Sequence, residues 1–148
     1  MNERRELIIR PFEGVGPVDF GMTREQVRQA VGSIVETFYK TPESILPTDA
    51  FDAVPMHVHY RPPDVCDLVH VFPPVLLLFQ GERLLNRPYA EIRAFFLEID
   101  PDIELDGDGF TSHKFGTGIY ASLADDAPQE PVEGVAVFER GYYEHETS

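Results

Sequence analysis

Residues 21–32 restrict the fold more than any other stretch of the chain, because they carry signals for both ends of a helix. Thr23 is a favourable N-cap, and Gln26 stands three residues later, where its side chain can complete a capping box. Gly32 suits a left-handed C-terminal cap, which a residue without a β-carbon adopts at low cost. The pattern therefore predicts an amphipathic helix whose buried face carries Val27, Ala30 and Val31.

A second helix is predicted over residues 88–99. Pro88 suits a first helical turn, with Asn86 or Arg87 as the cap, and the pair Asp100-Pro101 ends the helix because a residue before proline avoids helical geometry. Its predicted apolar face consists of Tyr89, Ile92, Phe96 and Ile99.

The rest of the chain reads as strands and turns. Strands are expected at residues 7–10, 34–39, 56–60, 65–72, 75–79, 103–105, 110–115, 118–123 and 135–143. Residues 41–55 contain Pro42, Pro47 and Pro55, which predicts a long loop with one helical turn near residues 48–51.

The two predicted helices align when Val27 is laid on Ile92, and each is followed by several predicted strands. This similarity suggests a duplicated unit. We therefore expect an α+β fold of two tandem helix-plus-antiparallel-sheet units, over residues 7–81 and 82–143. The chain length of 148 residues suits one compact domain covering residues 1–148.

Charge narrows the classes of partner. The chain has 26 acidic and 12 basic side chains, giving a formal net charge of −14. Nucleic-acid phosphates and anionic membrane surfaces carry the same sign, so direct binding to either is unfavourable. A basic protein is the natural complement, and the sequence does not indicate the oligomeric state.

The compartment is predicted from cysteine usage and the N-terminal residues. Cys66 is the single cysteine and cannot form an intramolecular disulfide. The apolar run of residues 7–9 is too short for the hydrophobic region of a signal peptide, and no segment approaches transmembrane length. We therefore expect a cytoplasmic protein.

The Gly-Met-Thr-x-x-Gln-Val-x-x-x-x-Gly wording of residues 21–32 resembles the helix signature of the SmpA/OmlA outer-membrane assembly lipoproteins, the BamE group. The apparent repeat resembles the β-lactamase-inhibitor-protein-like architecture, in which helices pack on antiparallel sheets. These resemblances imply a scaffold that binds another protein through its sheet and loops. Small acidic cytoplasmic proteins of this kind also resemble the immunity proteins of bacterial toxin systems, which implies a non-enzymatic inhibitor of a toxin and no cofactor.

Acidic side chains are the candidate binding residues for a basic toxin. One series recurs at every second residue, which would place it on one face of an extended chain, and a second group falls in a predicted loop. These carboxylates are Glu98, Asp100, Asp102, Glu104, Asp106 and Asp108 in the series, with Asp125 and Asp126, followed by Glu130 and Glu133, in the loop. The candidate aromatic anchors are Tyr39, Phe51, Tyr142 and Tyr143. A solvated acidic surface that keeps the chain soluble is the competing interpretation.

The alternative functions are a small enzyme or metal-dependent protein and a structural adaptor. His57 and His59 are two residues apart, so on a strand they share a side, and His70 with Cys66 follows on the next strand. Their spacing matches no standard zinc motif, and an ordinary polar sheet face is the competing interpretation. Residues 102–113 match the first half of a calcium loop, but His113 stands where that loop requires a glutamate. No nucleophile or dinucleotide motif is present.

Overall fold

The computed structural model describes residues 6–33 and 35–142, which form two helices and thirteen strands. The helices are α1 (Arg24–Val31) and α2 (Tyr89–Ile99). The strands are β1 (Glu6–Arg10), β2 (Gly14–Val15), β3 (Val18–Asp19), β4 (Val35–Phe38), β5 (Thr48–Phe51), β6 (Met56–Arg61), β7 (Val65–Val71), β8 (Leu76–Phe79), β9 (Glu82–Arg83), β10 (Glu104–Asp106), β11 (Gly109–Ser112), β12 (Thr117–Tyr120) and β13 (Gly134–Phe138).

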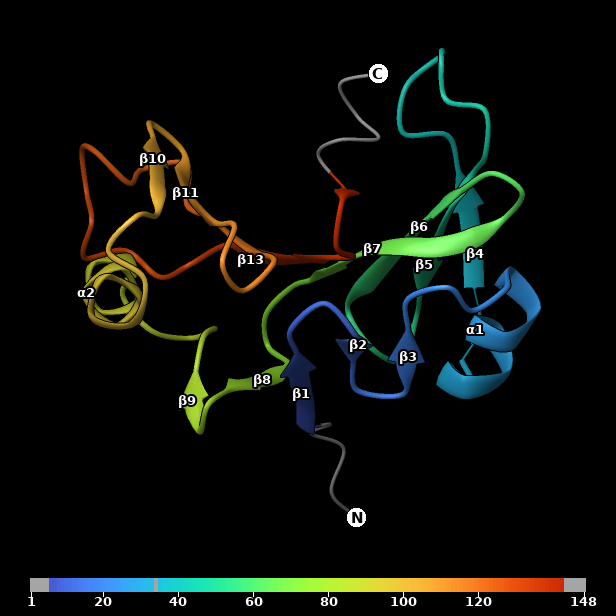
Figure 1. Ribbon diagram of the computed structural model, residues 1–148, viewed down its shortest axis with the longest axis horizontal. Helices are drawn as coiled ribbons and strands as arrows, with labels where there is room; N and C mark the ends of the chain where they lie inside the picture. Colours follow the sequence, from blue (N-terminus) through green and yellow to red (C-terminus); the bar gives the residue numbers. More distant parts are fainter. Residues whose placement is uncertain (1–5, 34, 143–148) are drawn as a thin grey trace.

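The strands build two sheets of unequal size. The larger has eight strands in the order β10-β11-β12-β13-β7-β6-β5-β4, and each neighbouring pair is antiparallel. The smaller has the order β3-β2-β1-β8-β9, with β1 and β8 parallel. Figure 1 shows β7 and β13 near the centre of the molecule, with α1 close to β4 at one end and α2 close to β10 at the other.

The expected α+β fold of two tandem units is wrong, because the chain is mostly β. Strands β7 and β13 bond to each other, so the strands that follow each helix merge into one sheet. The smaller sheet also crosses the expected boundary between residues 81 and 82, since it joins β1 to the β8–β9 hairpin. The similarity of the two helices carries no information about which strand edges will pair. It therefore could not show whether the strands form two sheets, one for each helix.

The predicted ends of α1 are confirmed. The Gln26 amide donates to Oγ1 of Thr23 at 3.2 Å, and the Thr23 amide donates to Oε1 of Gln26 at 2.9 Å, which completes the capping box. Gly32 takes a φ of 66°, the left-handed conformation expected at the helix end. Val27 and Val31 are buried, but Ala30 is exposed, so the buried face is narrower than predicted.

Helix α2 begins where predicted but without the predicted cap. Pro88 occupies the N-cap position and no side chain caps the helix, so neither Asn86 nor Arg87 serves that role. The Arg87 guanidinium instead donates to the carboxylates of Glu82 and Glu91. The predicted apolar face is largely correct, because three of its four residues are buried: Tyr89, Ile92 and Phe96.

Residues 48–51 form strand β5 rather than the predicted helical turn. This strand is hydrogen-bonded on both sides, to β4 and to β6, and three of its four residues are buried. Pairing with two neighbouring strands outweighs the local turn preference of a proline-rich segment.

The apolar core lies against one face of the large sheet and includes residues from both helices and both sheets. Phe79 of the small sheet, Phe96 of α2 and Phe110 of β11 meet there, with ring centroids 5.5 Å and 5.2 Å apart along that series. Within the described ranges, neither helix is long and apolar enough to cross a membrane.

Candidate functional site

The large sheet has one face on the core and one face turned away from it. On β6, Met56 and Val58 are buried in the core, so His57 and His59 project from the opposite side. We call this opposite side the open face. Cross-strand pairing extends it over the sheet, and it carries the side chains of Phe38, His57, His59, His70, Phe72 and Tyr120.

Aromatic and imidazole rings form a strip along the middle of the open face. The ring centroid of His57 lies 5.2 Å from that of Phe38 and 4.9 Å from that of Phe72. The His70 centroid lies 6.1 Å from that of Phe72. Phe38 remains 39% exposed and Tyr120 50% exposed, so part of this strip is accessible to a partner.

Two of these histidines share a hydrogen bond. Nε2 of His59 lies 3.0 Å from Nδ1 of His70, and Nδ1 of His59 lies 3.0 Å from Oγ1 of Thr48. Burial lowers the pKa of His59 to about 3, with His70 and Lys40 adding to the effect, and burial lowers the pKa of His70 to about 4. The pair is therefore neutral at neutral pH. Thr48 is only 3% exposed, so its hydroxyl has little access to a substrate.

Two hollows of the open face include its rings in their lining. One has a volume of about 810 Å³ and is lined by Lys40, His59, Asp67 and Tyr142, among others. The other has a volume of about 550 Å³ and is lined by rings, small residues and carboxylates. The open face thus combines accessible rings with concave surface, the usual composition of a binding surface.

The acidic series of residues 98–108 does not share one face. Glu98 is exposed on α2, whereas Asp100 is buried at the end of that helix and accepts hydrogen bonds from the Ser112 hydroxyl at 2.7 Å and the Asp102 amide at 3.1 Å. Asp100 is therefore a structural residue and the prediction that it binds a partner is wrong. Asp102 lies in the following turn, and Glu104 lies on β10, 3.0 Å from Nε2 of His113.

Three other predicted acids gather at one edge of the open face. Asp106 and Asp108 belong to the β10–β11 hairpin, where Oδ1 of Asp106 accepts a hydrogen bond from the Asp108 amide at 2.7 Å. A β-carbon placed on Gly107 would lie 3.6 Å from Oδ2 of Asp125, so the loop carboxylate reaches this hairpin. We call Asp106, Asp108 and Asp125 the acidic rim.

The acidic rim keeps its charge available. All three residues are exposed, and no salt bridge joins them to a cation within the described part of the chain. Burial raises the pKa of the Tyr89 phenol and Arg93 lowers it, while the negative charges of Asp106 and Asp125 raise it further. Asp126 is also exposed in the adjoining loop.

The predicted aromatic anchors differ in how exposed their side chains are. Tyr39 is 60% exposed, whereas Phe51 is buried in the core, so the prediction for Phe51 is wrong. Tyr142 is half-buried, with its ring centroid 5.6 Å from that of Phe138, and it lines the larger hollow of the open face. Tyr143 lies outside the described residues.

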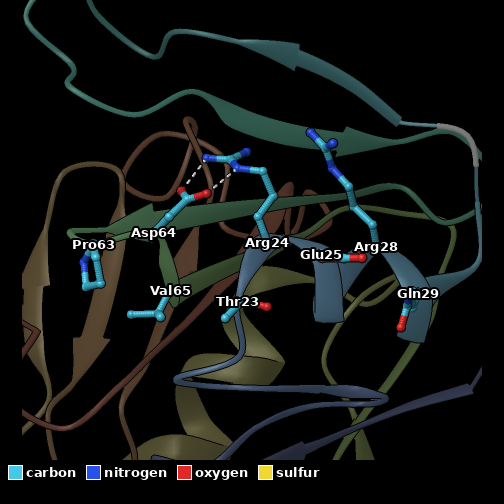
Figure 2. A pocket seen from close by; sticks show the side chains of 8 residues that line it. All are labelled: Thr23, Arg24, Glu25, Arg28, Gln29, Pro63, Asp64 and Val65. Atoms are coloured by element: carbon cyan, nitrogen blue, oxygen red, sulfur yellow. Dashed lines mark hydrogen bonds and ion pairs between the residues drawn. The ribbon is translucent and has the colours of Figure 1, made fainter.

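A third hollow, of about 790 Å³, lies beside α1 and is shown in Figure 2. The Arg24 guanidinium donates to both carboxylate oxygens of Asp64, at 2.9 Å and 2.8 Å, and to Oδ1 of Asp49 at 2.9 Å. Asp49 is fully buried and also accepts two hydrogen bonds from Arg28 and one from the Tyr60 hydroxyl. Two arginines and two carboxylates neutralise each other here, so this network fastens α1 to the sheet and leaves no net charge for a ligand.

Cys66 does not join the three histidines that were the other candidate zinc ligands. Cys66 is buried on the core side of the sheet, whereas His57, His59 and His70 belong to the open face. Burial raises the pKa of the Cys66 thiol, which disfavours the thiolate that zinc needs. Within residues 6–33 and 35–142, no group of three metal-ligating side chains is present, and this includes the calcium-loop candidates of residues 102–113.

Sequence reasoning missed the residues that shape the smaller hollow of the open face. The sequence pattern places Phe72, Gly118 and Tyr120 in predicted strands without a binding role, and it predicts nothing for Gly134. A signal was available, because glycine inside a strand often marks a place where another group approaches closely. Gly118 lies in the middle of β12 and satisfies that description.

No protein-family model, curated protein or solved structure matches this chain.

Proposed function

We propose that the protein is a non-enzymatic inhibitor that holds a basic protein partner on the open face of its large sheet. The observation that carries the proposal is the position of the acidic rim, which borders a face where rings and hollows are accessible. Opposite charges speed encounter and favour the correct partner, and the rings supply apolar area at the centre of the contact.

Net charge supports the same class of partner. With a formal charge of −14, the whole surface repels phosphate backbones and anionic membranes and attracts cationic proteins. The acidic rim concentrates part of this charge next to Tyr120, so attraction and apolar contact act at one place. A solvated acidic surface alone does not require accessible rings beside the carboxylates.

The narrower form of the proposal is an immunity protein that neutralises a basic bacterial toxin. It rests on the resemblance of a small acidic chain to that class and on the accessible rings and hollows of the open face. In this role the open face would block the toxin sterically, and no catalytic group is required.

The test compares three baits in an extract of the cells that make the protein. They are the wild type, a rim variant carrying Asp106→Asn, Asp108→Asn and Asp125→Asn, and a control carrying Glu25→Gln, Asp52→Asn and Glu98→Gln. The control removes the same charge from exposed positions outside the rim. We expect the wild type and the control to retain one stoichiometric basic protein, identified by mass spectrometry, and the rim variant to lose it.

Salt provides a second criterion. Raising the ionic strength from about 0.05 M to about 0.5 M shortens the screening length and should release the retained protein. Equal retention by all three baits at both ionic strengths would contradict binding at the acidic rim. If the retained protein has a measurable activity and keeps it in the complex, the inhibitor role is wrong even though the binding is real.

A further inference from the structure

The smaller hollow of the open face is a pocket formed on strands β7 and β10–β13 of the large sheet. It has a volume of about 550 Å³, and we call it the Tyr120 pocket. Its floor is made of small residues on adjacent strands, because Gly118 faces Ala136 across β12 and β13, and Ala136 faces His70 across β13 and β7. The side chains of Gly118 and Ala136 are too short to fill the space above them.

Two aromatic rings lie on the cross-strand row next to this floor. Tyr120 pairs with Gly134 across β12 and β13, and a β-carbon placed on Gly134 would lie 3.3 Å from two atoms of the Phe72 ring. Phe72 therefore lies over Gly134, close to the strand position that faces Tyr120. Tyr120 is 50% exposed, so its ring is available to a group that enters the pocket.

Gly118 is not required by the backbone. It has no positive φ, and a β-carbon there would meet its nearest neighbour, the Ala136 β-carbon, at an ordinary 3.8 Å. By contrast, a β-carbon on Gly109 would lie 1.9 Å from the Ile119 carbonyl oxygen, so that glycine is needed to let the two strands approach. The consequence of glycine at position 118 is an open floor.

Carboxylates stand at the edge of the same pocket. Asp106 and Asp108 line it, and Asp125 approaches Gly107 between them. A group bound here would contact aromatic rings and small apolar side chains along its length. Its end would lie next to the carboxylates of the acidic rim. A flat cation on an apolar stem satisfies both conditions.

We propose that the Tyr120 pocket binds an arginine side chain of the basic partner. The inference deepens the proposed function and depends on it for the source of the arginine. A guanidinium is planar, stacks on aromatic rings and can donate two hydrogen bonds to one carboxylate, whereas an ammonium is a compact, strongly hydrated charge. Its three-carbon stem would lie on the floor formed by Gly118 and Ala136.

The test requires no knowledge of the partner. The full chain, labelled with nitrogen-15, is titrated with N-acetyl-arginine amide and followed by amide proton–nitrogen correlation spectra. N-acetyl-citrulline amide, which has nearly the same shape without the charge, and N-acetyl-lysine amide are titrated in parallel. We expect saturable shifts of the Gly107, Gly118 and Gly134 amides, with binding at least about tenfold weaker for citrulline.

Variants separate shape from charge. Gly118→Val fills the floor and retains every carboxylate, while Ala50→Val adds comparable bulk elsewhere on the open face. We expect Gly118→Val to abolish the shifts and Ala50→Val to preserve them. If Gly118→Val does not fold, Tyr120→Ala removes an exposed ring instead and should weaken arginine binding.

Equal shifts with arginine and citrulline, or shifts spread over all exposed carboxylates, would overturn the pocket. In that case the proposed function still stands if the wild-type bait retains a basic protein that the rim variant loses. The reverse result, a specific arginine response without any retained basic protein, supports the pocket and counts against the proposed function.

Discussion

Nε2 of His59 and Nδ1 of His70 lie 3.0 Å apart on the open face, close enough for one imidazole to donate a hydrogen bond to the other. That bond requires one protonated and one unprotonated nitrogen between the two rings. A proton on both facing nitrogens would replace the bond with a repulsive contact between two N–H groups. Burial acts in the same direction and holds the pKa of His59 at about 3 and that of His70 at about 4.

The first prediction is that the protein loses stability on acidification. In the unfolded chain both histidines have a pKa near 6.5. Below that pH the unfolded chain therefore binds protons that the folded pair does not bind. Stability should therefore fall as the pH drops from about 6.5 to about 4, by about 2 kcal/mol for each pH unit, because each of the two histidines contributes up to about 1.4 kcal/mol. Lys40 and His57 add to the effect, because both lower the pKa of this pair.

Urea unfolding at several pH values measures this slope. The double variant His59→Gln, His70→Gln should flatten it, whereas His113→Gln, at an exposed histidine, should leave it unchanged. A wild-type stability that stays constant or rises between about pH 6.5 and about pH 4 would contradict the neutral pair.

The second prediction concerns Asp49, which is fully buried and accepts hydrogen bonds from Arg24, Arg28 and Tyr60. Asp49→Asn removes the negative charge that pairs with the guanidinium groups of Arg24 and Arg28. We expect the free energy of unfolding to fall by about 3 kcal/mol, the cost of breaking a buried ion pair. Asp52→Asn, in the exposed turn after β5, is the matched control and should change stability little. Similar urea midpoints for the two variants would show that the network does not fasten α1.

The third prediction uses two glycines of the same hairpin. Gly109 has a φ of 136°, and a β-carbon there would lie 1.9 Å from the Ile119 carbonyl oxygen. Gly107 has its nearest neighbour at 3.6 Å, which is ordinary contact. Gly109→Ala should therefore destabilise the protein by on the order of 3 kcal/mol, and Gly107→Ala by much less. Equal thermal midpoints for the two variants would mean that β11 and β12 are not this close.

Local signals in the sequence predicted α1 well. The capping box of Thr23 and Gln26 and the terminal Gly32 are short-range features, so their geometry depends little on the rest of the chain. The second helix was also placed correctly, because its apolar period is long enough to be distinctive.

Strand pairing was the part that local signals did not predict. Nothing in the sequence of β7 or β13 states that these two strands bond to each other, yet this contact merges the strands that follow each helix into one sheet. The same limitation explains β5, whose buried Asp49 becomes understandable only once Arg24 and Arg28 are known to face it.

The candidate site shows the same division. The sequence identified the acidic residues, but a period of two holds only along one strand, and the series of residues 98–108 passes from a helix through a turn into a hairpin. Asp100, at the end of the helix, is buried. Asp106 and Asp108, in the hairpin, lie close to Asp125 of a loop that is distant in the sequence. The lining of the Tyr120 pocket comes from β7, β10, β11, β12 and β13, and only the pairing of these strands brings it together.

The fourth prediction is kinetic. With the captured basic partner, the rim variant carrying Asp106→Asn, Asp108→Asn and Asp125→Asn should associate at least about tenfold more slowly than the wild type at low salt. The difference should shrink as salt is added, because screening weakens long-range attraction. Surface plasmon resonance measures both. An unchanged association rate, with only faster dissociation, would show that the acidic rim contributes contacts without steering.

The most direct test of the central claim is hydroxyl-radical footprinting of the complex with the basic partner. Tyr120 and Phe38 on the open face are 50% and 39% exposed, and Leu97 on α2 is 42% exposed, so each is open to oxidation in the free protein. If the open face binds the partner, mass spectrometry will show oxidation of Tyr120 and Phe38 falling in the complex while that of Leu97 is unchanged. Protection of Leu97 with undiminished oxidation of Tyr120 and Phe38 would contradict the account.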